Sequence, residues 1–95
     1  MREKVGRANA TSETLVPSGK IASSTDLGRL VRARRKASGL GLVEAAGLAG
    51  VGVRFLSELE RGKATASLGK TLQVLQRLGL EVWIHPRGRA PRGAR

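Results

Sequence analysis

The stretch LVEAAGLAGVGVRFLSELER, residues 42–61, decides the fold of this chain. Its first part predicts a short helix over about Leu42–Leu48, and Ala49–Val51 predicts a tight turn around a glycine. Its second part predicts a helix over Val53–Arg61, which Gly62 ends. The stretch therefore predicts two short helices joined by a glycine-bearing turn, the arrangement called helix-turn-helix.

Two further helices are predicted on either side of this stretch. The first opens with Ser24 or Thr25 as N-cap and ends at Gly39. Helical spacing predicts that its inner stripe consists of Leu27, Leu30, Val31 and Arg34/Arg35. The other runs from Ser67 to Leu78 and ends at Gly79. Its inner face is expected to consist of Leu68, Leu72, Leu75 and Leu78.

After Gly79 the hydrophobic period changes from helical to alternating. Leu80, Val82 and Ile84 alternate with Glu81, Trp83 and His85, which is typical of a half-buried strand. A lone strand leaves its backbone groups unpaired, so we expect it to pair with the same strand of a second copy. The residues assigned to this dimer strand are Leu80, Val82, Trp83 and Ile84. The predicted fold class is all-α, a compact domain of about four helices plus one short C-terminal strand that pairs across a dimer.

The chain divides into one domain and two tails. Residues 1–23 are polar and aperiodic and predict a flexible N-terminal arm. Residues 24–85 form the helix-turn-helix domain with its C-terminal strand. Residues 86–95 carry arginines among Gly and Pro, so we expect a disordered basic tail.

Composition narrows the classes of function. The net charge of +11 favours polyanionic partners. With no Cys and one His, thiol chemistry and Cys/His metal clusters are excluded, and we expect no cofactor and no metal. One Phe, one Trp and no Tyr leave no platform for stacking unpaired bases. The basic start leads into polar residues, and no apolar run approaches the roughly 20 residues that span a bilayer. We therefore expect no membrane contact and a cytoplasmic, nucleoid-associated location.

From Asp26 to Gly79 the chain resembles the Xre/Cro-type helix-turn-helix regulators. The residues that carry the resemblance are LGRLVRARRKASGLGLVEAAGLAGVGVRFLSELERGK followed by LGKTLQVLQRLGL. Because the strand EVWIHP follows the last helix, the chain is most similar to the HipB-like antitoxin-repressors of toxin–antitoxin pairs. The resemblance implies a homodimer whose second motif helix lies in the major groove of double-stranded DNA.

Residue by residue, the resemblance assigns structural roles. Gly50 is similar to the turn glycine of the family, where a positive φ or a close helix approach leaves no room for a side chain. Arg35 and Glu60 occupy the positions of a partly buried ion pair, which is a structural role. The core of the motif is expected to consist of Val51, Leu56 and Leu59.

The resemblance also implies the DNA contacts. Base contacts would fall to the outer face of the predicted helix 53–61, at Val53, Arg54, Ser57 and Glu58. Arg54 suits a guanine edge, Val53 a thymine methyl and Glu58 a cytosine amino group. The candidate phosphate contacts are Arg29, Arg32, Lys36, Arg61 and Lys63.

The chain departs from the family at the start of the second predicted helix. Gly41 stands where the family has a Thr or Ser N-cap, and Leu42 stands where it has a Gln that touches DNA. Ala45 replaces a core Leu, so Leu40 or Leu42 is expected to fill the space. Gly52 replaces a Ser or Thr. These changes predict weaker phosphate anchoring by this helix.

The leading hypothesis is a sequence-specific DNA-binding repressor that is the antitoxin of a toxin–antitoxin operon and represses its own promoter. The alternative is a protein-binding antitoxin that neutralises a HipA-like kinase, with weak or no specific DNA binding. A third hypothesis is non-specific coating of nucleic acid by charge. The sequence shows no pairing of a nucleophile with a base, so we expect no enzyme and no catalytic residue.

Overall fold

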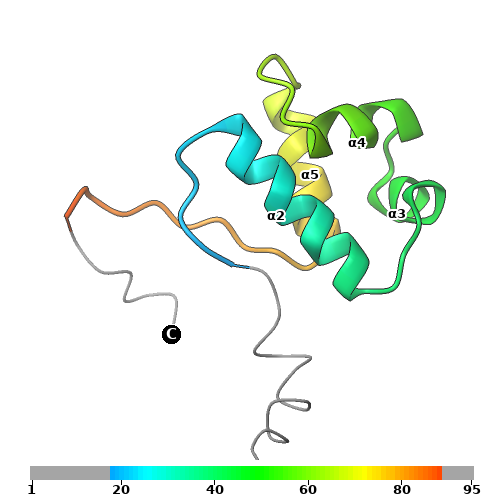
Figure 1. Cartoon of the computed structure of the whole chain (residues 1–95), viewed down its shortest axis with the longest axis horizontal. Helices are drawn as coiled ribbons and strands as arrows, with labels where there is room; N and C mark the ends of the chain where they lie inside the picture. Colours follow the sequence, from blue (N-terminus) through cyan, green and yellow to red (C-terminus); the bar gives the residue numbers. More distant parts are fainter. Residues whose placement is uncertain (1–17, 89–95) are drawn as a thin grey trace, which may run out of the picture.

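The computed structural model describes residues 18–88, and within them it contains four helices and no strand. The helices are α2 (Ser24–Ala37), α3 (Leu42–Ala49), α4 (Val53–Glu60) and α5 (Leu68–Arg77). Figure 1 shows α2 crossing in front of α5, with α3 and α4 beside it. The predicted all-α fold is confirmed, and each helix lies within a residue or two of its predicted range.

The start of α2 differs by one residue from the prediction. Ser23, not Ser24 or Thr25, is the N-cap, and its Oγ accepts a hydrogen bond from the Asp26 backbone N–H at 3.1 Å. Ser24 makes a different hydrogen bond, in which its Oγ donates to the Gly62 carbonyl at 2.9 Å. The backbone N–H of Ala22 donates to the Asp26 carboxylate at 2.9 Å. Within residues 18–88, this is the hydrogen bond nearest the N-terminal end.

The core lies where the four helices meet and contains several small side chains. Val31, Leu56 and Val74 are its largest fully buried residues. The other buried apolar residues are Ala45, Ala46, Ala49, Leu59, Leu75 and Leu78. Leu40 and Leu42 pack against this cluster, to which Ala45 belongs.

The prediction for the inner face of α5 is wrong in part. Leu75 and Leu78 are buried, but Leu68 is 71% and Leu72 44% exposed. Thr71 and Val74 take the inner positions instead. Thr71 can be buried because its hydroxyl donates to the Ser67 carbonyl at 2.7 Å, so no polar group is left unpaired. Leu68 and Leu72 consequently form an apolar stripe on the outside of the domain.

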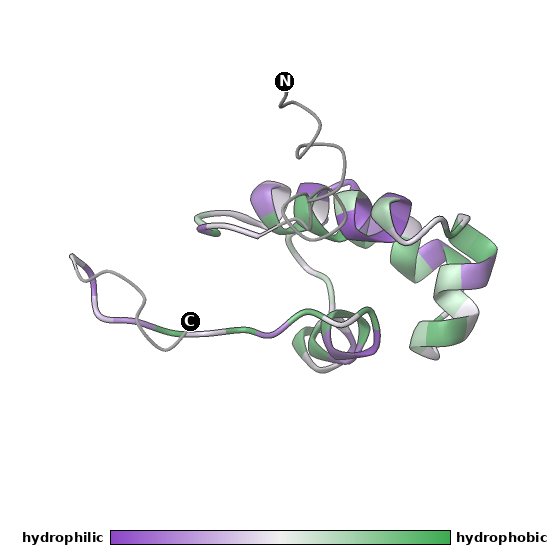
Figure 2. Cartoon of the chain, turned by 90° about the horizontal axis from the view of Figure 1, so that it is seen from below, coloured by the Kyte–Doolittle hydropathy of each residue, from purple (hydrophilic) through white to green (hydrophobic). Residues whose placement is uncertain are grey.

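The segment after α5 is extended and leaves the helices. Figure 2 shows it running away from the helical body. Gly79 turns the chain with φ +83°, and Leu80 still packs on the core. No backbone partner for residues 81–86 is present among the described residues of this single chain. The strand and its pairing across a dimer therefore stay a prediction.

The predicted tails fall mostly outside the structure. Residues 1–17 of the N-terminal arm and 89–95 of the basic tail lie outside the described residues. Among residues 18–88, no helix combines the length and apolar character needed to cross a membrane.

Helices α2 and α4 approach each other at Gly28, a residue that the sequence reasoning did not single out. A Cβ at this position would lie 2.5 Å from the Leu59 carbonyl oxygen and 2.6 Å from that of Glu60. These are backbone atoms and cannot rotate away. Glycine is therefore required here for the close packing of the two helices.

We expect Gly28→Ala to lower the free energy of unfolding by about 1–3 kcal/mol, because the helices must move apart. Gly47→Ala is the matched control, since its Cβ would meet nothing within 4 Å. That control should be neutral or should stabilise by about 0.5–1 kcal/mol, because alanine restricts the unfolded chain. Urea denaturation measures both. Equal stabilities for the two variants would contradict the close-packing account.

Candidate nucleic-acid interface

The turn between α3 and α4 sets the direction of α4. Gly50 ends α3 with φ +74°, and a Cβ there would lie 2.9 Å from Nε2 of Gln73. Gly50 thus has both properties expected of the turn glycine, a positive φ and a close neighbour. The backbone N–H of Val51 closes the turn by donating to the Ala46 carbonyl at 3.0 Å.

Two side chains of α5 hold this turn, and the sequence reasoning missed both. Nε2 of Gln73 donates to the carbonyls of Ala49 at 2.8 Å and Gly50 at 3.3 Å. Nη1 of Arg77 donates to the Leu48 carbonyl at 3.4 Å. The last carbonyls of a helix lack internal partners and attract such donors. Because the donors come from a helix far along the chain, sequence pattern offers no signal for the pairing.

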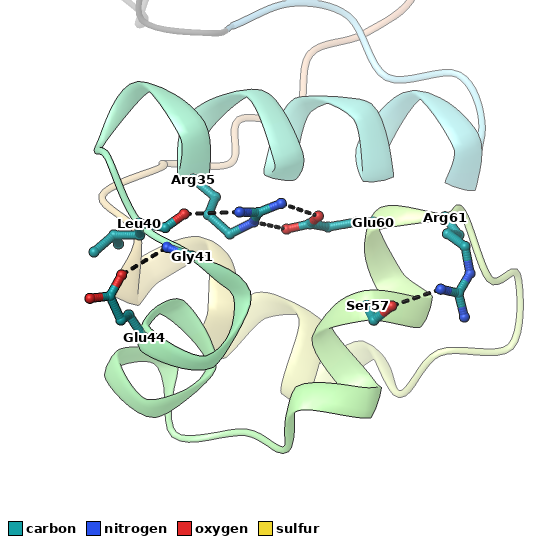
Figure 3. A network of polar contacts seen from close by, with 7 residues as sticks. All are labelled: Arg35, Leu40, Gly41, Glu44, Ser57, Glu60 and Arg61. Atoms are coloured by element: carbon teal, nitrogen blue, oxygen red, sulfur yellow. Dashed lines mark hydrogen bonds and ion pairs between the residues drawn. The ribbon is translucent and has the colours of Figure 1, made fainter.

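The Arg35–Glu60 pair joins α2 to the end of α4. Nε of Arg35 donates to Oε2 of Glu60 at 2.6 Å, and Nη2 donates to Oε1 at 3.0 Å. The side chains are 10% and 6% exposed. The third donor, Nη1, bonds the Leu40 carbonyl at 2.9 Å (Figure 3). The hydrogen bonds to Glu60 raise the pKa of Arg35 above its ordinary value. One guanidinium therefore fixes α2, the α2–α3 corner and α4 together.

The outer face of α4 presents the four predicted base-contact residues together. Val53 and Arg54 are exposed, and Ser57 and Glu58 are partly buried. Nε of Arg54 donates to Oε2 of Glu58 at 3.2 Å. The two residues are four positions apart, so they lie one turn from each other on the same side of the helix.

Two of the predicted phosphate contacts belong to the same surface. Nη1 of Arg61 donates to Oγ of Ser57 at 2.7 Å (Figure 3). Nζ of Lys63 donates to Oε1 of Glu58 at 3.0 Å. The hydrogen bond from Lys63, followed in size by the one from Arg54, lowers the pKa of Glu58. The Glu58 carboxylate is therefore ionised at neutral pH. We call these five polar residues, Arg54, Ser57, Glu58, Arg61 and Lys63, the α4 polar cluster.

The other predicted phosphate contacts lie on a different part of the molecule. Arg29, Arg32 and Lys36 are all exposed on α2. At 100° per residue they form a stripe about 100° around the helix from the buried Val31 and Arg35. Among residues 18–88, no hydrogen bond or ion pair joins this stripe to the α4 polar cluster.

The start of α3 offers little to a phosphate. Gly41 caps the helix without a side chain, and its backbone N–H donates to the Glu44 carboxylate at 2.9 Å (Figure 3). Val43 is 71% and Leu48 53% exposed, so the outer face of α3 is largely apolar. Weaker phosphate anchoring by this helix stays a prediction, and the missing cap side chain at Gly41 is consistent with it.

An open apolar groove lies between α5 and the C-terminal segment. Its volume is about 340 Å³, and its lining comprises Leu72, Leu75, Gln76, Leu80, Glu81, Val82 and Trp83. Val82 is 56%, Trp83 51% and Ile84 92% exposed, and the Trp83 and His85 rings stack at 6.3 Å. Three of the four predicted dimer-strand residues thus stand open to solvent beside this groove.

Comparisons with known proteins bear on this surface. The family model of the helix-turn-helix domain matches residues 26–82. The uncharacterized HTH-type transcriptional regulator y4mF of Sinorhizobium fredii is 52% identical over 65 residues, which cover 68% of this chain and 86% of that protein. Among solved structures, a HipB–O4 20mer complex and a HipA–HipB–O2–O3 complex each match with TM-score 0.67. Each is 24% identical and covers 74% of this chain and 99% of the matched chain. The predicted resemblance is confirmed, for HipB at the level of the fold.

We expect Glu60→Leu to lower the free energy of unfolding by about 3–5 kcal/mol, because it leaves the buried Arg35 guanidinium without its counter-charge. Urea denaturation followed by circular dichroism measures the change. The double variant Arg35→Leu/Glu60→Leu should regain most of the loss, since no charge is then left unpaired. If the single variant does not fold, recovery of helical structure in the double variant gives the test. A loss below about 1 kcal/mol, as for an exposed pair, would contradict the assigned role.

Proposed function

The chain belongs to the helix-turn-helix domain family of transcriptional regulators, and from that premise we propose that it is a sequence-specific repressor that binds double-stranded DNA. The α4 polar cluster is the observation that carries this proposal. In the helix-turn-helix arrangement the second helix enters the major groove. Here that helix is α4, whose outer face carries polar groups suited to base edges, and cations suited to phosphates follow directly after its last residue.

Each residue of this face has a distinct task in the proposal. Arg54 contacts a guanine O6/N7 edge, and Val53 packs on a thymine methyl. Ser57 donates to or accepts from a neighbouring base edge, and the Glu58 carboxylate accepts from a cytosine amino group. The cations Arg61 and Lys63 contact the flanking phosphates, while Arg29, Arg32 and Lys36 add to the positive field that attracts DNA.

We further propose that two copies act as a homodimer. The groove beside α5 and the exposed Trp83 and Ile84 provide an apolar surface that a second copy would cover. Pairing of the two extended segments would satisfy their open backbone groups. A two-fold dimer requires an operator with two half-sites about 34–36 Å apart.

The proposed biological role is that of an antitoxin that represses its own operon, in the cytoplasm and on the nucleoid, with no catalytic activity of its own. Support comes from the shared fold of HipB, which one matched structure shows in complex with an O4 20mer and another in complex with HipA and O2–O3. A HipA-like kinase is the proposed protein partner. Co-purification with a kinase encoded beside this gene tests that part.

A second candidate function is an antitoxin that binds its kinase and has weak or no sequence-specific affinity for DNA. The start of α3 favours it, because Gly41 has no side chain to offer and Val43 and Leu48 are exposed and apolar. Fluorescence anisotropy with the DNA upstream of the gene and with a scrambled duplex distinguishes the two. A preference of about a thousandfold supports the repressor. Equal, salt-sensitive affinities support the second candidate.

We expect Arg54→Ala to reduce affinity for the preferred duplex by about 1–3 kcal/mol and to relax discrimination, because a base contact is lost. Lys63→Ala should instead weaken binding to both duplexes alike and reduce the salt slope by about 1, because a phosphate contact is lost. Anisotropy titrations at several salt concentrations measure both variants. If Arg54→Ala bound the preferred duplex as well as the parent does, the assignment of base contacts to α4 would be wrong.

We expect Leu72→Asp and Val82→Pro each to shift the protein toward monomer. The first places a charge in the apolar groove, and the second removes a backbone donor from the proposed strand pair. Val43→Asp is the matched control, because Val43 is also an exposed apolar residue but lies on α3. Sedimentation equilibrium gives the mass of each variant. A dimer of unchanged strength in both test variants would place the interface elsewhere.

A further inference from the structure

Glu58 is the one carboxylate that α4 presents on its outer face. The other acid of the helix, Glu60, is engaged in the buried pair with Arg35. Both carboxylate oxygens of Glu58 bind a cation. Oε2 pairs with Nε of Arg54 at 3.2 Å, and Oε1 pairs with Nζ of Lys63 at 3.0 Å. A residue proposed to contact a base and one proposed to contact a phosphate thus share a single acidic partner.

The geometry of the Arg54–Glu58 bond leaves the guanidinium able to bind a base. The bond uses Nε, the nitrogen nearest the aliphatic stem, so the two terminal nitrogens are not needed for it. A bidentate contact to a guanine O6/N7 edge requires two adjacent N–H donors. The side chain of Glu58 is 23% exposed and that of Arg54 is 91% exposed. The more buried carboxylate therefore binds Arg54 close to its aliphatic part, while the rest of the arginine side chain extends into solvent.

The charge of Glu58 has a second effect. Non-specific affinity for DNA depends on how many phosphates are neutralised by Lys and Arg. An ionised carboxylate between Arg54 and Lys63 offsets part of their positive charge and repels phosphates itself. The same residue would therefore restrain Arg54 and lower the attraction of α4 for any sequence.

We propose that Glu58 is a specificity-determining residue that positions Arg54 for a guanine edge and weakens binding to other DNA. The inference rests on the proposed function, since it names a residue that sets the discrimination of the same surface. Toward guanine its role is positioning, because it acts on that base through Arg54, beside its own proposed contact with a cytosine amino group.

The test compares Glu58→Gln with the parent in the full-length protein. The probes are a duplex that the parent selects from a randomised pool and a scrambled duplex of equal length, titrated by anisotropy at several salt concentrations. Glu44→Gln is the matched control, because it removes the same charge from an exposed residue outside α4 and its amide oxygen can still accept the hydrogen bond from the Gly41 backbone N–H. For Glu58→Gln we expect affinity for the scrambled duplex to rise about two- to fivefold, the range of exposed ion pairs, while affinity for the selected duplex does not rise. The control should leave the ratio of the two affinities unchanged.

A second measurement isolates the positioning of Arg54. Replacing the guanines of the selected duplex with 7-deazaguanine removes the N7 acceptor of the major groove. This replacement should weaken the parent and should weaken Glu58→Gln by a smaller factor, because Arg54 is no longer held toward the base.

The outcomes separate the inference from the proposed function. If the parent prefers no duplex, the proposed function is wrong and the inference with it. If the parent discriminates and Glu58→Gln keeps the same ratio of affinities, the inference alone is wrong. An equal rise in affinity for both duplexes would also overturn it, because Glu58 would then act only through net charge.

Discussion

The buried ion pair between Arg35 and Glu60 is the constraint on which the rest of this structure depends. A charged group shielded from water must keep its partner, so the two side chains hold α2 and α4 at one separation and one angle. The third donor of Arg35 binds Leu40 and thereby includes the entry to α3. Gly28 makes the same arrangement possible sterically, because only a residue without Cβ lets α4 carbonyls come so close to α2.

Polar contacts also hold the motif from its other side. Gln73 and Arg77 of α5 bind the carbonyls that end α3, so the turn before α4 is fixed by a helix outside the motif. The core between these contacts is small, and its α3 layer consists of alanines. With few large side chains to interlock, directional hydrogen bonds make a large contribution to the orientation of α4. The consequence for function is that the α4 polar cluster sits on a helix held from α2 and from α5.

Much of this architecture could be predicted from the sequence, and the exceptions have physical reasons. Local signals predicted the four helices and the turn at Gly50, and family resemblance predicted the pairing of Arg35 with Glu60. Leu68 and Leu72 were wrongly placed inside, because helical spacing alone does not show that Thr71 can be buried with its hydroxyl bonded to the preceding turn. Contacts that cross between distant helices, such as that of Gln73, leave no local pattern. The network around Glu58 was likewise missed, although its i, i+4 spacing from Arg54 was a signal.

The central claim is that the outer face of α4 reads base edges in the major groove, and methylation interference tests it most directly. Duplexes methylated at guanine N7, which lies in the major groove, are separated into bound and unbound fractions and the excluded positions are mapped. The account predicts that N7 methylation blocks binding at two clusters of guanines about one helical turn apart. Binding that is indifferent to N7 methylation at every guanine would contradict it, because Arg54 would then have no guanine edge to contact.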